Sequence, residues 1–325
     1  MKKQDMFELI EYGLKKQDDN FRKKVESILA DEKAAFHRAN VDFLERLLDT
    51  RVTRFLNQDH GYFTDAINEN MVKDLLYVKR PVKTLDKLEL PDTLRRVVAE
   101  IIEEQKQKEK LEEHGLSPRS RILLEGPPGN GKTCLAEALA NALQLPFLVV
   151  RQEQLINSYL GKTANNLYKV LSYAVKQPCV LFIDEFDAIG SNRHQSASDT
   201  NEFNRVVNSL LTEMDALPSY VIFIVATNRG DALDKALWRR FQISMTLPMP
   251  TLEGLTHYYK QYMEDHHLVL PMEATSLAEV TLPCSYADAE ELMITLHRKM
   301  VLHEDTFKLD DELKQWRKIR RKQEA

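Results

Sequence analysis

The chain has 325 residues, of which 43% are apolar and 29% are charged, a composition typical of globular rather than disordered proteins. Its net charge of -5 gives no general attraction to nucleic acid or to anionic membranes, so neither is expected as a partner. No apolar run reaches the roughly 18 to 20 residues that cross a bilayer, and the N-terminus lacks a signal-peptide pattern, so we expect a cytoplasmic protein. Cys134, Cys179 and Cys284 lie too far apart to predict a disulfide framework or a zinc site.

The first 80 residues have the apolar spacing of helices rather than strands. Phe21, Val25 and Ile28 recur near the helical period, and Asp19 or Asn20 can cap a helix before them. Pro81 disfavours helix at the residue before it, so the chain is expected to leave this part near residue 80. We therefore predict an N-terminal helical domain over residues 1–80 that recruits a substrate or partner.

The middle of the chain alternates short apolar runs with longer helical patterns. The apolar runs are "RILLE", "FLVV", "VLFID", "VIFIVAT" and "ISMTL". Continuous apolar strands separated by helices are typical of a parallel sheet covered on both faces. We predict an α/β fold, a parallel sheet sandwiched by helices, over residues 81–248, followed by a small helical lid over residues 249–325. In the last helix acids precede bases, which complements a helix dipole and favours a solvated helix; contact with phosphates or an anionic partner is the alternative.

The segment "GPPGNGKT", residues 126–133, fits the phosphate-binding loop of P-loop nucleotide hydrolases. It follows an apolar strand and precedes an amphipathic helix, which is the context that this loop requires. Its backbone N–H groups can bind an anion, Lys132 can reach the outer phosphates, and the Thr133 hydroxyl can coordinate Mg²⁺. ATP and Mg²⁺ are the predicted cofactors. The loop residues expected around the nucleotide are Pro128, Gly129, Asn130, Gly131, Lys132, Thr133 and Cys134.

Polar residues follow two later apolar runs, where open α/β sheets bind ligands. Asp184 is expected to hold Mg²⁺ together with Thr133, and Glu185 to orient and deprotonate the attacking water. Asn228 can hold that water or the terminal phosphate. For Asp187 a catalytic role and a surface or helix-capping role are equal alternatives.

The segments "GPPGNGKT", "LFIDEFDAIG", "ATNRGDALDKALWRRF" and "SYADAEEL" resemble, in order and near spacing, the AAA family of ATPases over about two-thirds of the chain. This resemblance implies that Asn228 is the sensor-1 residue. It also implies that Arg239 and Arg240 are arginine fingers that reach the nucleotide of the next subunit in a hexameric ring, a pattern similar to katanin and spastin; ordinary surface ion pairs are the alternative. Ala287 is expected near the nucleotide, although "SYADAEEL" also reads as a capping box in which Ser285 pairs with Asp288.

The triplet Tyr159, Leu160 and Gly161 lies where this family carries its pore loop. The resemblance implies that the aromatic and aliphatic side chains grip an extended polypeptide and that the glycine bends the loop. The alternative is that these residues are covered within the ring or cap a helix.

The expected function is a ring-forming AAA ATPase that hydrolyses ATP to unfold, thread or remodel protein substrates through a central pore. The chain also resembles bacterial AAA proteins that are often encoded beside a subtilisin-like protease, which implies a separate protease partner. One alternative is a nucleotide-controlled switch that acts on a partner enzyme, for example a protease in bacterial defence. A nucleic-acid motor or clamp loader is a second alternative, which the acidic balance disfavours.

Overall fold

The computed structural model describes residues 72, 74–155, 160–187, 210–230, 235–302 and 307–323. These residues belong to the second of two compact units, Ile67–Ala325. Residues 1–71 of the predicted N-terminal domain lie outside them, as does Tyr159 of the predicted pore loop. None of the helices in the described ranges combines the length and apolarity that a membrane span requires.

The described residues form one six-stranded sheet with the order β1-β3-β4-β5-β2-β6. The strands are β1 (Leu76–Lys79), β2 (Arg121–Glu125), β3 (Phe147–Val150), β4 (Cys179–Ile183), β5 (Val221–Thr227) and β6 (Ile243–Thr246). The five apolar runs predicted as strands are β2 to β6, and their pairings are parallel, as expected. β1 is an addition: it precedes residue 81, where we expected the α/β part to begin, and pairs antiparallel with β3. The predicted boundaries at residues 80 and 248 stay predictions.

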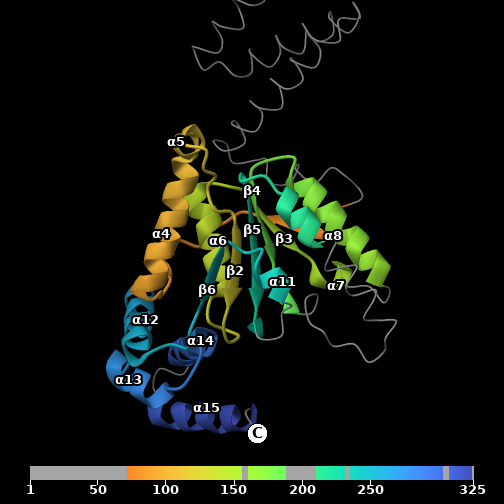
Figure 1. Cartoon of the computed structure of the whole chain (residues 1–325). Coiled ribbons are helices and arrows are strands. Elements are labelled where there is room, and N and C mark those ends of the chain that lie inside the picture. The colour runs from red at the N-terminus through yellow and green to blue at the C-terminus, as the bar shows by residue number, and fades with distance from the viewer. Residues whose placement is uncertain are drawn as a thin grey trace, which may run out of the picture. The chain divides into compact units, whose positions relative to one another are not determined.

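Helices cover both faces of the sheet (Figure 1). On one face α4 (Asp92–Lys106) and α6 (Lys132–Leu143) pack on Ile122, Val180 and Phe182. On the other face α8 (Leu160–Ala174) and the helical residues 210–216 pack on side chains such as Leu181 and Phe223. Successive residues of β4 therefore enter opposite cores, which is why its sequence is apolar without alternation.

Shorter helices join these elements. They are η1 (Leu85–Lys87), α5 (Lys108–Glu113), α7 (Gln152–Leu155) and α11 (Lys235–Trp238). η1 contacts α6, so the segment that follows β1 returns along the helix that begins at the glycine-rich loop.

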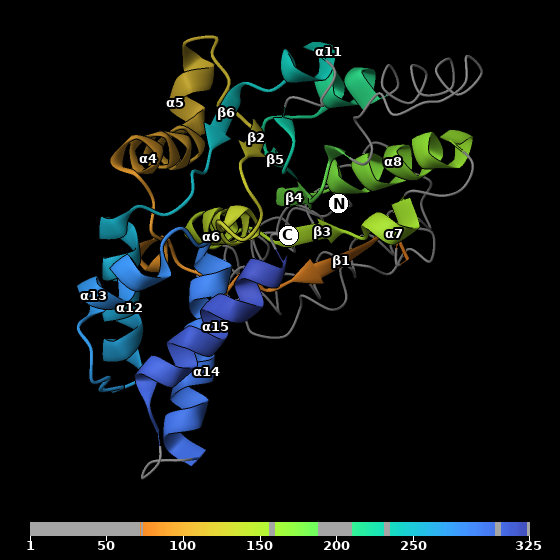
Figure 2. The same ribbon diagram turned by 90° about the horizontal axis from the view of Figure 1, so that it is seen from below.

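The C-terminal helices have a hydrophobic core of their own. They are α12 (Leu252–Asp265), α13 (Ala274–Thr281), α14 (Tyr286–Leu302) and α15 (Leu309–Gln323), grouped together in Figure 2. Tyr259 is fully buried in this core and donates a hydrogen bond to Thr281 Oγ1 over 2.9 Å. α14 begins with the predicted capping box: the Ser285 N–H donates to Asp288 Oδ2 over 2.8 Å, and the Asp288 N–H donates to Ser285 Oγ over 3.2 Å.

Candidate nucleotide site

The loop between β2 and α6 fits only with glycine at two of its positions. Gly126 has a φ of +142°, and a Cβ there would lie 2.1 Å from the carbonyl oxygen of Leu247. Gly129 has a φ of +77°, and a Cβ there would lie 2.6 Å from Ser285 Oγ. Both angles favour glycine as well. The loop is therefore packed between the end of the sheet and the start of α14, with its N–H groups at the N-terminus of α6.

Lys132 is the first residue of α6 and is only 6% exposed. Its Nζ donates hydrogen bonds to the carbonyl oxygens of Gly126 (2.6 Å) and Pro127 (2.9 Å) and to Asn228 Oδ1 (2.7 Å). Burial lowers the pKa of this ammonium, and nearby carboxylates oppose the shift. The predicted phosphate-binding lysine and the predicted sensor amide thus meet directly, at the carboxyl ends of neighbouring strands β2 and β5.

Thr133 and Asp184 also meet. The threonine Oγ1 donates to Asp184 Oδ2 over 2.8 Å, and Asp184 Oδ1 accepts the backbone N–H of Glu185 over 2.9 Å. Glu185 has a φ of +45°, a conformation that costs energy for a residue with a side chain and that often occurs at functional sites. A hydroxyl and a carboxylate side by side are oxygen ligands of the type that Mg²⁺ prefers, so this pair fits the predicted metal.

Asp187 binds the end of β5, a contact that neither the surface nor the helix-capping alternative described. Its Oδ1 accepts a hydrogen bond from Thr227 Oγ1 over 3.0 Å, and the same threonine oxygen accepts the Arg229 N–H over 3.0 Å. These bonds tie the segment after β4 to the end of β5. Asn228 lies between Thr227, the last residue of β5, and Arg229, so Asp187 helps to fix the backbone that carries the predicted sensor.

A cavity of about 390 Å³ joins these residues, a volume within the usual range for small-molecule sites. The residues predicted for the site that line it are Pro128, Gly129, Asn130, Gly131, Lys132, Thr133, Cys134, Asp184, Glu185, Asn228 and Ala287. The residues that sequence reasoning missed are Lys83, Lys87, Leu88, Glu89, Leu90, Tyr258, Tyr286 and Glu290. The cavity therefore has one wall from the segment between β1 and α4, and another from α12 and α14.

The wall from the C-terminal helices is aromatic and bonded to the glycine-rich loop. The rings of Tyr258 and Tyr286 lie edge to face with their centroids 5.7 Å apart, and the Ala287 N–H donates to the Gly129 carbonyl oxygen over 3.0 Å. Burial raises the pKa of Tyr286 to about 12, so this phenol stays neutral near pH 7. An aromatic surface beside a phosphate-binding loop can bind the base of a nucleotide.

Asn130 has an unsatisfied polar atom beside the same cavity. The side chain is 5% exposed, and its Nδ2 donates to Met249 Sδ over 3.3 Å. Its buried Oδ1 has no hydrogen-bond partner among the described residues. Buried oxygens of this kind usually have a partner, so a bound group or water can complete this one.

Arg239 and Arg240 lie away from this cavity. They follow α11, and the Arg240 carbonyl oxygen accepts a hydrogen bond from Arg121 Nε over 3.0 Å, at the first residue of β2. Because β2 runs from Arg121 toward the glycine-rich loop, the arginines lie at the amino end of this strand and the cavity lies at its carboxyl end. Arg240 Nη1 pairs with Asp215 Oδ2 over 2.8 Å, which matches the surface ion-pair alternative for this residue. In the predicted pore loop, Leu160 and Gly161 begin α8.

Several known proteins are similar in sequence to this chain. The family model "ATPase family associated with various cellular activities (AAA)" matches residues 122–249. An uncharacterised AAA family ATPase, y4kL, of Sinorhizobium fredii is 33% identical over 304 residues, which cover 91% of this chain and 90% of that protein. A proteasome-activating nucleotidase of Methanopyrus kandleri is 36% identical over 67% of this chain and 52% of its own length. For the ATP-dependent zinc metalloprotease FtsH 3 of Phytoplasma mali these values are 38%, 57% and 32%. The chain belongs to the AAA family of ATPases and is an ATP hydrolase.

Proposed function

We propose that this chain forms a hexameric ring that uses ATP hydrolysis to unfold, thread or remodel polypeptides through a central pore. The observation that carries the proposal is that Lys132, Asp184 and Asn228 line one cavity together with residues of α12 and α14. Two relatives, a proteasome-activating nucleotidase and an ATP-dependent metalloprotease, have names that link this module to proteolysis. We extend the proposal to a cytoplasmic ring with a separate protease partner.

Each polar group at the cavity has a proposed role. Lys132 turns from the loop carbonyls to the outer phosphates, and Asn228 holds the attacking water or the terminal phosphate. Thr133 and Asp184 hold Mg²⁺, which neutralises charge on the phosphates when it is bound. Glu185 lines the cavity next to Asp184 and is the base that takes the proton of the water.

The arginines are proposed to act on a neighbouring subunit. The two ends of β2 are about 13 Å apart, at about 3.3 Å a residue. Arg239 lies near the amino end of this strand and the cavity lies beyond its carboxyl end, so Arg239 is far from the cavity of its own chain. Arg239 is exposed and has no ion pair within the described part of the chain, whereas Arg240 is paired with Asp215. An exposed guanidinium at the amino end of the strands is suited to stabilise phosphate charge on the next subunit of a ring.

A trapping experiment tests the threading proposal. Glu185→Gln keeps the residues proposed to bind ATP and Mg²⁺ but removes the base, so the ring is expected to stall closed on its substrate. The variant is purified from its native host with ATP present and compared with a Glu185→Gln, Tyr159→Ala double variant. Threading predicts polypeptides that are retained by the single variant and lost from the double variant.

The same comparison separates the alternatives. A folded partner bound in fixed ratio to both variants would favour the nucleotide-controlled switch, because a switch needs no grip by Tyr159. Identical polypeptide profiles from both variants would contradict threading. A wild-type preparation in ADP serves as the control, because a ring that releases its substrate after hydrolysis should retain little of it.

A further inference from the structure

Glu137 is a buried carboxylate on α6 to which the proposed chemistry assigns no role. It is only 2% exposed. Its carboxylate accepts hydrogen bonds from Lys79 Nζ over 2.6 Å, from the Val82 N–H over 3.0 Å and from the Lys83 N–H over 3.4 Å. Lys79 is the last residue of β1, and Val82 and Lys83 belong to the segment that follows it, so one side chain of α6 holds the chain where it leaves this strand.

The contacts of Glu137 are those of a charged group. Burial alone would raise the pKa of its carboxyl, but the hydrogen bonds from Lys79 and from the two backbone amides lower it overall. Asn141, one turn further along α6, adds a second attachment, because its Nδ2 donates to the Lys83 carbonyl oxygen over 2.8 Å. The segment is thus bound to α6 through both its N–H groups and a carbonyl group.

The segment held by Glu137 leads directly into the cavity. Lys83 and residues 87–90 form the wall of the nucleotide cavity that the β1–α4 connection contributes. The far end of this wall is attached to α12, where Lys87 Nζ pairs with Asp265 Oδ2 over 2.8 Å and Glu89 pairs with His257. The wall is therefore held between the helix that bears Lys132 and the first helix of the C-terminal group.

We propose that Glu137 is a positioning residue for nucleotide binding, because it fixes the wall formed by Lys83 and residues 87–90 to the helix that carries Lys132. This inference rests on the nucleotide site proposed above. Glu137 itself lines no part of the cavity, so it acts through the backbone that it holds. Its loss is expected to weaken nucleotide binding and to leave the hydrolytic step unchanged, because Asp184, Glu185 and Asn228 are attached to β4 and β5 instead.

The test compares nucleotide affinity with turnover in the full-length protein. Glu137→Gln and Asn141→Ala are assayed for binding of a fluorescent ATP analogue and for KM and kcat of ATP hydrolysis. We expect Glu137→Gln to raise Kd and KM by about tenfold with kcat within about twofold of wild type. Asn141→Ala should shift Kd and KM in the same direction by a smaller factor.

Glu104→Gln is the matched control, since Glu104 is also a carboxylate bound to a side-chain cation and a backbone N–H, but lies outside the cavity lining. An equal rise in KM for Glu104→Gln would attribute the effect to lost stability and overturn the inference. Wild-type affinity in both Glu137→Gln and Asn141→Ala would also overturn it. If Glu137→Gln fails to fold, Asn141→Ala decides, because its contact is exposed. Unchanged binding in Lys132→Ala would instead show that the proposed nucleotide site is wrong.

Discussion

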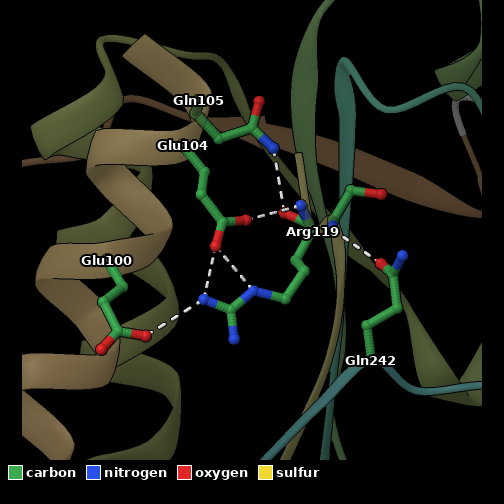
Figure 3. Close-up of polar contacts among 6 residues, drawn as sticks. Glu100, Glu104, Gln105, Arg119 and Gln242 are labelled. Atoms are coloured by element: carbon green, nitrogen blue, oxygen red, sulfur yellow. Dashed lines mark hydrogen bonds and ion pairs between the residues drawn. The ribbon is translucent and has the colours of Figure 1, made fainter. Parts of the chain in front are cut away.

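Arg119, which lies just before β2, shows how a single side chain sets the local geometry of this molecule. Its Nε donates to Glu104 Oε1 over 2.8 Å, its backbone N–H donates to Glu104 Oε2 over 2.9 Å, and its Nη2 reaches Glu100 over 3.1 Å (Figure 3). Gln105 Nε2 donates to the Arg119 carbonyl oxygen over 3.0 Å. Because both carboxylates and the amide belong to α4, these bonds fix that helix to a residue just before β2, the strand that leads into the glycine-rich loop.

This cluster predicts a pH dependence of stability. Burial alone would raise the pKa of Glu104, but the hydrogen bonds from Arg119 lower it below its ordinary value of 4.5. Since the folded-state pKa lies below the unfolded one, the stabilisation is complete above about pH 4.5 and is lost as the pH falls through the folded-state pKa. Glu104→Gln is expected to reduce the free energy of unfolding by about 1 kcal/mol at pH 7 and to flatten its decline in acid. Urea unfolding at several pH values measures the free energy of unfolding and its fall in acid. If this free energy fell equally with pH in wild type and variant, Glu104 would not be the source of the pH dependence.

At the scale of elements, the start of α14 links helix stability to the nucleotide cavity. Ser285 caps this helix, and two residues later the Ala287 N–H bonds to Gly129 of the loop. Ser285→Ala is expected to cost about 1 kcal/mol of unfolding free energy and to weaken ATP binding, because the position of the first turn is no longer fixed. Thermal unfolding with and without ATP measures both effects.

Thr251→Ala is the control for this prediction. Thr251 caps α12 in the same manner, since its Oγ1 accepts the Gly254 N–H over 3.1 Å, but it does not line the nucleotide cavity. We expect a similar loss of stability in this variant and the full stabilisation by ATP. Equal ATP stabilisation in the Ser285→Ala and Thr251→Ala variants would show that the cap of α14 has no specific connection to the cavity.

The sequence predicted elements wherever a local pattern was strong. β4 and β5 are buried on both faces, so their apolar runs were unambiguous, and the glycine-rich loop has a fixed spacing that depends on short-range backbone geometry. β1 was missed because it is a four-residue edge strand in which Leu76 is buried but Tyr77 is 41% exposed. Lys83 and Tyr286 were missed for another reason: tertiary packing alone brings these distant segments to one cavity.

At the scale of the whole molecule, the two ends of the strands carry the two halves of one proposed site, the nucleotide cavity and the arginine finger. The cavity lies at the carboxyl ends of the strands, and Arg239 lies near the amino end of β2. One chain therefore cannot bring its own Arg239 to its own nucleotide without dismantling the sheet. A head-to-tail contact between copies would bring the two halves together, and such contacts close into rings.

Mixing two inactive variants tests this arrangement. Lys132→Ala lacks a working phosphate site and Arg239→Ala lacks the finger, so each alone should lose at least about 10³-fold in ATPase rate. In rings assembled from equal amounts of both, about a quarter of the interfaces should pair an intact Arg239 with an intact loop, and activity should reappear in proportion. Arg240→Ala replaces Arg239→Ala in a parallel mixture, and complementation by that pair alone would assign the finger to Arg240. If neither mixture exceeds the activity of its separate components, the arginines do not act between subunits, and the ring must complete its catalytic site from other residues.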